Sequence, residues 1–209
     1  MIERYDGHIL GLATSDGRRV VVGRWLRSPW PPFADVMSED AAGWRTLLAP
    51  TPAVAEEISQ TYVFDEVVIT PVRLTCDPAA REWRVEAGPF DAVVTLGGRT
   101  ALGAMLTALP RTIARSRAFA TAADPVARAV FPDVRTRGTA GGGRREWYGA
   151  LGQHRVVAVR ATWDSVPCGE LTATVPPVRF GFSSVPGRPT VTAVRTTISG
   201  GGSSRTVAG

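Results

Sequence analysis

Two amino acid types are missing from the chain: its 209 residues include no lysine and no asparagine. All 24 basic residues are therefore arginine. The absence of lysine excludes Schiff-base chemistry on a lysine amine and phosphate loops of the Walker type, which need a Gly-Lys-Ser/Thr ending. The absence of asparagine excludes Asn-Gly hairpin turns. A GC-rich genome also favours arginine over lysine codons, so this composition alone assigns the arginines no function.

Cysteine and histidine are scarce. Cys76 and Cys168 are isolated and His8 and His154 are the only histidines, so the sequence indicates no disulfide framework, no metal site and no cofactor motif. No apolar run approaches the ~20 residues of a membrane helix, and the charged N-terminus lacks a signal-peptide core. These absences predict a soluble cytoplasmic protein that does not associate with membranes.

The arginines that are present are unevenly distributed. The net charge is +5, but residues 1–70 contain more acids than arginines, whereas most of the arginines fall in residues 71–209. Arginine stays charged at any working pH, and its planar fork of donors suits carboxylates and phosphates. The asymmetry therefore indicates an anionic partner, or two parts of one domain that neutralise each other.

The apolar pattern predicts an α+β fold, with a large curved antiparallel sheet or open barrel and helices near 51–62 and 99–130. Asp16-Gly17 favours a type I′ hairpin turn between strands at 8–14 and 19–25, and Thr51-Pro52 is typical of a helix start. Further strands are expected at 34–37, 45–49, 64–74, 82–87, 90–96, 144–151, 154–163, 171–175, 178–182 and 190–198. We expect a single domain over 1–199 and a flexible tail over 200–209. Two small domains divided near 97–143 are the alternative.

The first candidate site is a hairpin over residues 144–163. Gly152-Gln153 suits a two-residue type II′ turn, which would place Arg145 opposite Arg160 and put Trp147 and His154 on the same face. Like charges directly opposite one another are destabilising, so an anion between them would explain the pair. A shifted register, or two arginines that point into solvent, is the alternative.

The second candidate is the proline-rich loop between Trp25 and Asp35. It carries Arg27 and Trp30 on a stiff frame that would lose little entropy on binding a ligand. The alternative is a loop whose aromatic side chains cover the core.

Three weaker signals remain. Gly97-Gly98 before a predicted helix could bind phosphate, although it matches no nucleotide-binding motif. The segment 111–145 is rich in arginine and would suit nucleic acid or an acidic partner, but no DNA-binding motif accompanies it. Cys168 could act as a nucleophile if His154 lay beside it.

The sequence therefore favours a protein that binds, and in one reading acts on, a small anionic or carbonyl-bearing molecule in a sheet-lined cavity through arginine side chains. A nucleic-acid or acidic-partner binding protein that uses residues 111–145 is the alternative. Whether the protein is an enzyme and how many copies assemble are left open by the sequence.

Overall fold

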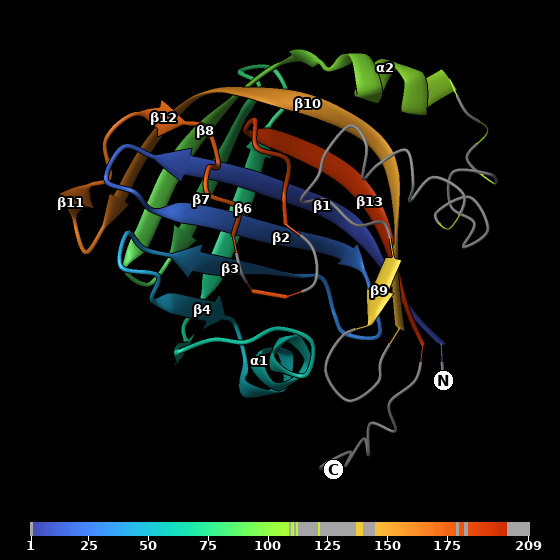
Figure 1. Cartoon of the computed structure of the whole chain (residues 1–209), viewed down its shortest axis with the longest axis horizontal. Coiled ribbons are helices and arrows are strands. Elements are labelled where there is room, and N and C mark those ends of the chain that lie inside the picture. Colours follow the sequence, from blue (N-terminus) through green and yellow to red (C-terminus); the bar gives the residue numbers. More distant parts are fainter. Residues whose placement is uncertain are drawn as a thin grey trace.

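A computed structural model describes residues 2–108, 110, 112, 121, 137–139, 145–178, 180–181 and 184–199. Its centre is one strongly curved sheet with the strand order β5-β4-β3-β2-β1-β13-β10-β8-β7-β6 (Figure 1). All neighbours on this path are antiparallel except β4 and β5. The predicted α+β fold with a curved sheet is confirmed.

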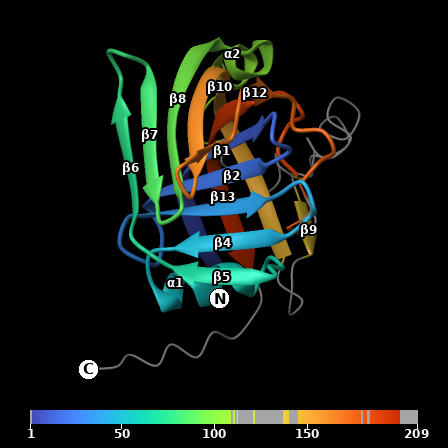
Figure 2. The same ribbon diagram turned by 90° about the vertical axis from the view of Figure 1, so that its left-hand side faces the viewer.

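The curved sheet forms a half-barrel, and two runs of strands form its opposing walls. The first wall contains β1 (Ile2–Thr14), β2 (Arg19–Arg27), β3 (Phe33–Glu39), β4 (Arg45–Ala49) and β5 (Glu66–Ile69). The second contains β6 (Val72–Asp77), β7 (Glu82–Ala87), β8 (Phe90–Arg99) and part of β10 (Arg145–Trp163). Figure 2 shows the strands of the first wall crossing those of the second. β13 (Thr190–Ser199) joins β1 to β10.

The concave face between these walls holds the main core. Leu10, Val22 and Val36 from the first wall pack with Val85 and Phe90 from the second. These side chains are almost completely removed from water, and each such burial stabilises a fold by roughly 1.5–3 kcal/mol. The alternation that predicted strands also explains this core, because every second residue points to the concave face.

The opposite, convex face of the first wall is covered by α1 (Pro52–Ser59) and by the segment before β13. Thr51 caps α1 as predicted, because its hydroxyl accepts a hydrogen bond of 3.2 Å from the Val54 amide. Val54 packs on Leu47 of β4, and Phe180 packs on Val21 of β2. The second helix, α2 (Ala101–Ala108), lies along β10.

The predicted hairpin at 144–163 is wrong, because these residues form one continuous strand, β10. A type II′ turn needs positive φ at its glycine, and Gly152 does not adopt it. Instead Gly152 follows an irregularity in the pairing of β10 with β13, between Ala150 and Gly152. Gln153, expected at an exposed tip, is buried, and its side chain contacts Thr100 and Thr192.

Several shorter predictions also change. Gly17 has a positive φ but Asp16 does not, so the β1–β2 turn is not type I′. The strand expected over 64–74 is two strands, β5 and β6, separated at Thr70 and Pro71. Beyond them, 171–175 contributes only the two-residue β12 (Leu171–Thr172), and of the expected strand 178–182 the described Val178 and Phe180 contribute side chains to the core. The short strands β9 (Arg137–Thr139) and β11 (Val166–Pro167) both pair with β10.

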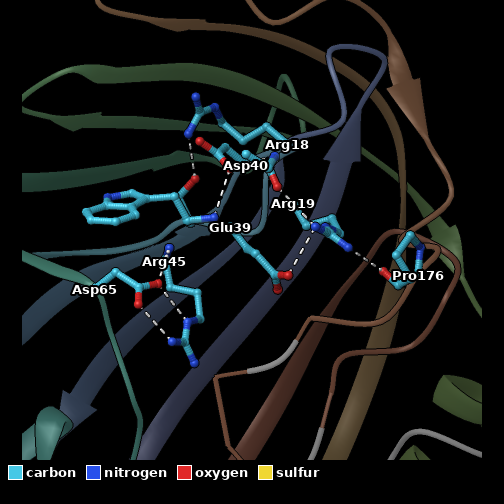
Figure 3. A network of polar contacts seen from close by, with 10 residues as sticks. Arg18, Arg19, Glu39, Asp40, Arg45, Asp65 and Pro176 are labelled. Carbon is cyan, nitrogen blue, oxygen red and sulfur yellow. Dashed lines mark hydrogen bonds and ion pairs between the residues drawn. The ribbon is translucent and has the colours of Figure 1, made fainter.

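Arginine side chains form ion pairs between neighbouring strands of the first wall, as Figure 3 shows. Arg19 of β2 donates to Glu39 of β3 at 3.1 Å and to the carbonyl oxygen of Pro176 at 3.4 Å. Arg45 of β4 forms a bidentate ion pair with Asp65, which lies just before β5. The two hydrogen bonds, from Nε to Oδ2 and from Nη2 to Oδ1, are both 2.9 Å long. None of the described helices is long and apolar enough to cross a bilayer.

Candidate functional site

The register of the sheet places a cationic region at one end of the concave face. Even-numbered residues of β1 point to this face, and they change from Leu10 and Leu12 to His8, Asp6 and Arg4 toward the N-terminus. Antiparallel partners share a face, so each of these residues defines a row across the sheet. The row of Leu10 is apolar on β2 and β13, where it meets Val22 and Val191. The rows beyond it are polar.

Three polar rows, together with Arg145 beyond the last of them, make up this region, which we call the cationic end. The row of His8 contains Arg24 of β2 and Ala193 of β13. The row of Asp6 contains Arg27 of β2 and Arg195 of β13, and the row of Arg4 contains Thr197 of β13 and Trp147 of β10. Arg145 continues the face one step further, level with Ile2 and Ser199.

The ionic pairing at the cationic end is incomplete. Asp6 is engaged by Arg195 in a two-pronged contact with both distances at 2.6 Å. The ion pairs found within the described part of the chain do not involve Arg4, Arg24, Arg27 or Arg145. Arg24 is half-buried, whereas Arg4, Arg27 and Arg145 are exposed. Cations therefore exceed acids on this face.

His8 and Trp83 connect the two walls at the inner boundary of the cationic end. The rings meet edge to face, with centroids 5.6 Å apart, and the Arg24 guanidinium lies 5.8 Å from the Trp83 ring centroid. Burial and the neighbouring Arg24 both lower the pKa of His8, so its ring is neutral at neutral pH. Its Nδ1 atom is buried and, among the described residues, has no hydrogen-bond partner.

Cys76 of β6 lies directly across from Trp83. Burial raises the pKa of its thiol, so the sulfur is protonated at neutral pH. Cys76 and Cys168 are both free cysteines. Within the described residues, no group of three His, Cys, Asp or Glu side chains is arranged to hold a metal ion.

Four of the six site residues predicted from sequence lie on the concave face. Arg27, Arg145 and Trp147 belong to the cationic end, and His154 lies level with Leu10 and Val191 where β10 meets β8. Trp30 is half-buried. Because it lies in the loop between β2 and β3, the strand register assigns it to neither face. Sequence patterning missed His8 and Trp83 as site residues. The change from apolar to polar at even positions of 2–14 was the signal that could have found the first of them.

Arg160 is separated from the other predicted residues. It lies fifteen positions along β10 from Arg145, which corresponds to ~50 Å of extended strand, and it points to the opposite face. Val159 and Ala161 on either side of it belong to the core. The prediction that Arg145 and Arg160 oppose each other is therefore wrong, because β10 does not turn back.

Arg160 lies instead in a shallow hollow of about 740 Å³ on the convex face of the second wall. Val93 lies between it and Arg84, while Glu86, Asp91 and Glu170 also line the hollow. Acids slightly outnumber arginines among these side chains, so the hollow has no preference for anions.

The structure does not favour two further hypotheses from the sequence, phosphate binding at Gly97-Gly98 and a catalytic pair of Cys168 with His154. Gly97 and Gly98 lie inside β8 and not at the start of α2, where the Thr100 hydroxyl accepts a hydrogen bond of 2.9 Å from the Gly103 amide. The Cys168 amide bonds to Ala161, seven residues or ~23 Å along β10 from His154, so these two side chains do not form a catalytic pair. Burial raises the pKa of the Cys168 thiol as well. Most of the basic segment 111–145, and with it much of the helical region expected near 99–130, lies outside the described residues.

Comparison with known proteins gives little guidance. No protein-family model matches the chain, and no curated protein matches it. A solved structure with some likeness is a protein from Nitrosomonas europaea described provisionally as AttH, at 14% sequence identity and a TM-score of 0.30. The alignment covers 93% of this chain but 38% of that one, so this chain spans well under half of that protein's length. A likeness this weak supports no conclusion on function.

Proposed function

We propose that the protein binds a small organic anion at the cationic end of its concave face. The observation that carries this proposal is the excess of cations there. Arg4, Arg24, Arg27 and Arg145 share one face by register, and the acid Asp6 is already held by Arg195. An anion would supply the missing negative charge.

The surroundings of Arg24 indicate what else the ligand carries. The row beyond Arg24 is apolar, and Trp83 offers an aromatic ring beside it. The buried Nδ1 of His8 would accept or donate one hydrogen bond, depending on its tautomer. A carboxylate, or a carbonyl group next to one, attached to a flat apolar body would satisfy the guanidinium, the imidazole and the apolar row together.

Arginine suits this role because its planar fork binds a carboxylate through two parallel hydrogen bonds. Arg24 is half-buried beside the Trp83 ring, and a charge interaction that is partly removed from water is stronger than one in open solvent. Binding is supported by these contacts, whereas among the described residues the one thiol and imidazole considered as a catalytic pair, Cys168 and His154, lie apart. Binding, rather than catalysis, is therefore the function that we put forward.

Two fluorescent probes that differ by one sulfonate group test this proposal. 1-Anilinonaphthalene-8-sulfonate is an aromatic anion, and N-phenyl-1-naphthylamine is its neutral counterpart. We expect the anion to bind more tightly than the neutral probe, and Arg24→Ala and Arg27→Ala each to weaken the anion about tenfold while leaving the neutral probe nearly unchanged. Such a loss corresponds to ~1.4 kcal/mol, within the range of a charge-assisted hydrogen bond.

Arg160→Ala is the matched control, because it removes an arginine from the convex face of the same sheet. It should leave the affinity for both probes unchanged. Equal losses for Arg24→Ala and Arg160→Ala would show that the net charge of the protein attracts the probe, and the proposal would then be wrong. Tight binding of nucleic acid with no binding of the anionic probe would favour the basic segment 111–145 instead.

A further inference from the structure

The last strand of the sheet, β6, has a free edge. It pairs with β7 on one side and, within the described part of the chain, with no strand on the other. Figure 2 shows β6 at the outer margin of the molecule, beyond β7. A free edge presents a row of backbone donors and acceptors that can pair with another strand.

β6 has few of the features that usually protect an edge. Its six residues contain no proline, its register against β7 is regular, and its inward-facing residues are the apolar Val72, Leu74 and Cys76. Proteins commonly block an edge with an internal proline, a bulge or an inward-pointing charge. Pro71 and Pro78 lie just outside the strand and limit any pairing to the residues between them.

The strand is self-complementary in one antiparallel register. If Thr75 lies opposite Thr75 of a second copy, Arg73 of each chain lies opposite Asp77 of the other, and Leu74 lies opposite Cys76. Arg73, Thr75 and Asp77 are all exposed on the convex face. Opposite charges directly across an antiparallel pair are stabilising, so this register has favourable contacts on both faces.

The hairpin of β6 and β7 leaves one unfavourable contact that this pairing would relieve. Asp77 lies directly across from Glu82 of β7, and like charges in that position destabilise a sheet. Asp77 Oδ1 accepts from the amides of Ala79 and Ala80, which leaves Oδ2 for a cation. In the self-paired register, the Arg73 side chain of the second copy would lie beside this carboxylate.

We infer that β6 pairs with β6 of a second copy of the chain, so that one sheet continues through a two-fold dimer centred on Thr75. The occupant is a second copy because the charge pattern of the strand is complementary to its own reverse. The contact covers one short strand per chain, so the dimer is concentration-dependent. This inference is independent of the proposed anion binding.

Disulfide trapping tests the register. Thr75→Cys in a Cys76→Ser background places two thiols across the two-fold axis, and mild oxidation should convert most of the protein to covalent dimer. Arg73→Cys in the same background is the matched control, because position 73 lies opposite position 77 and not opposite itself. We expect at least fivefold less covalent dimer from the control. Equal yields from the two variants, or no dimer from the first, would overturn the inference.

Charge reversal tests the complementarity separately. In the Thr75→Cys/Cys76→Ser background, Arg73→Asp alone and Asp77→Arg alone each place like charges opposite one another and should reduce trapping several-fold. Mixing these two variants pairs opposite charges at both positions and should restore it. Far-ultraviolet circular dichroism on each variant checks that the sheet is intact. Failure of the mixture to exceed either variant alone would contradict self-pairing through β6.

Discussion

Asp35 is an acidic residue that the fold buries almost completely. Its side chain lies on β3 at 2% exposure, and its Oδ1 accepts a hydrogen bond of 2.9 Å from the Trp25 indole. Burial raises the pKa of this carboxyl group to about 6, although the Trp25 hydrogen bond acts in the opposite direction. In the unfolded chain the value is about 3.9, so the folded state binds the proton more strongly.

This difference predicts how stability depends on pH. Between about pH 4 and pH 6 the folded state holds a proton that the unfolded state has released, so the free energy of unfolding falls as pH rises and levels off above pH 6. The contribution of Asp35 is a loss of ~3 kcal/mol across this window. Asp35→Asn keeps an acceptor for Trp25 and should remove that loss. Urea unfolding at pH 4 and pH 7 measures the free energy of unfolding of both proteins. The same change in this free energy between the two pH values for both proteins would contradict the expectation.

Two ion pairs in Figure 3 differ in burial and should differ in energy. The Arg19–Glu39 pair is almost completely buried, whereas the side chains of Arg45 and Asp65 are 26% and 29% exposed. Arg19→Met leaves a buried carboxylate without this partner and should cost ~3–5 kcal/mol. Arg45→Met, the control, should lower the free energy of unfolding far less, because exposed pairs contribute little. Chemical denaturation of the two variants compares them, and similar costs would argue against the burial of the first pair.

At the scale of elements, the contact between α2 and β10 depends on one glycine. A methyl group on Gly103 would overlap the backbone carbonyl of Gln153, whereas a methyl group on Gly98 would meet nothing within 4 Å. Gly103→Ala should therefore push α2 away from β10 and cost ~1–3 kcal/mol. Gly98→Ala should change the free energy of unfolding little. Thermal unfolding of both variants provides the measurement, and an unaffected Gly103→Ala protein would show that α2 does not pack this closely.

The same contact explains why the hairpin prediction failed. Gly152-Gln153 between two alternating runs resembles a turn, and only local signals are available in a sequence. In the folded chain Gly152 lies beside α2, with Thr107 as its neighbour, and Gln153 binds Thr100 and Thr192 from other elements. A glycine inside a long strand and a glycine at a turn look alike in sequence. Strands at 82–87 and 90–96 were predicted well, because they pair with sequence neighbours.

At the scale of the whole molecule, the sheet brings distant charges together. Arg24 and Arg27 come from the acidic first part of the sequence and Arg145 from the basic second part, yet they share one face because β1 and β13 join the two parts. The sequence predicted the curved sheet and an arginine-lined face. It could not identify which arginines meet, because that depends on the order of strands in the sheet. Arg160 was misassigned for the same reason.

The central claim is that the cationic end of the concave face binds an organic anion. A crystal of the protein soaked with 4-bromobenzoate tests it most directly, because anomalous scattering from bromine locates the ligand independently of the protein atoms. We expect the carboxylate on the guanidinium of Arg24 or Arg27 and the ring beside Trp83. A bromine peak confined to the convex hollow around Arg84 and Arg160, with none on the concave face, would contradict the account.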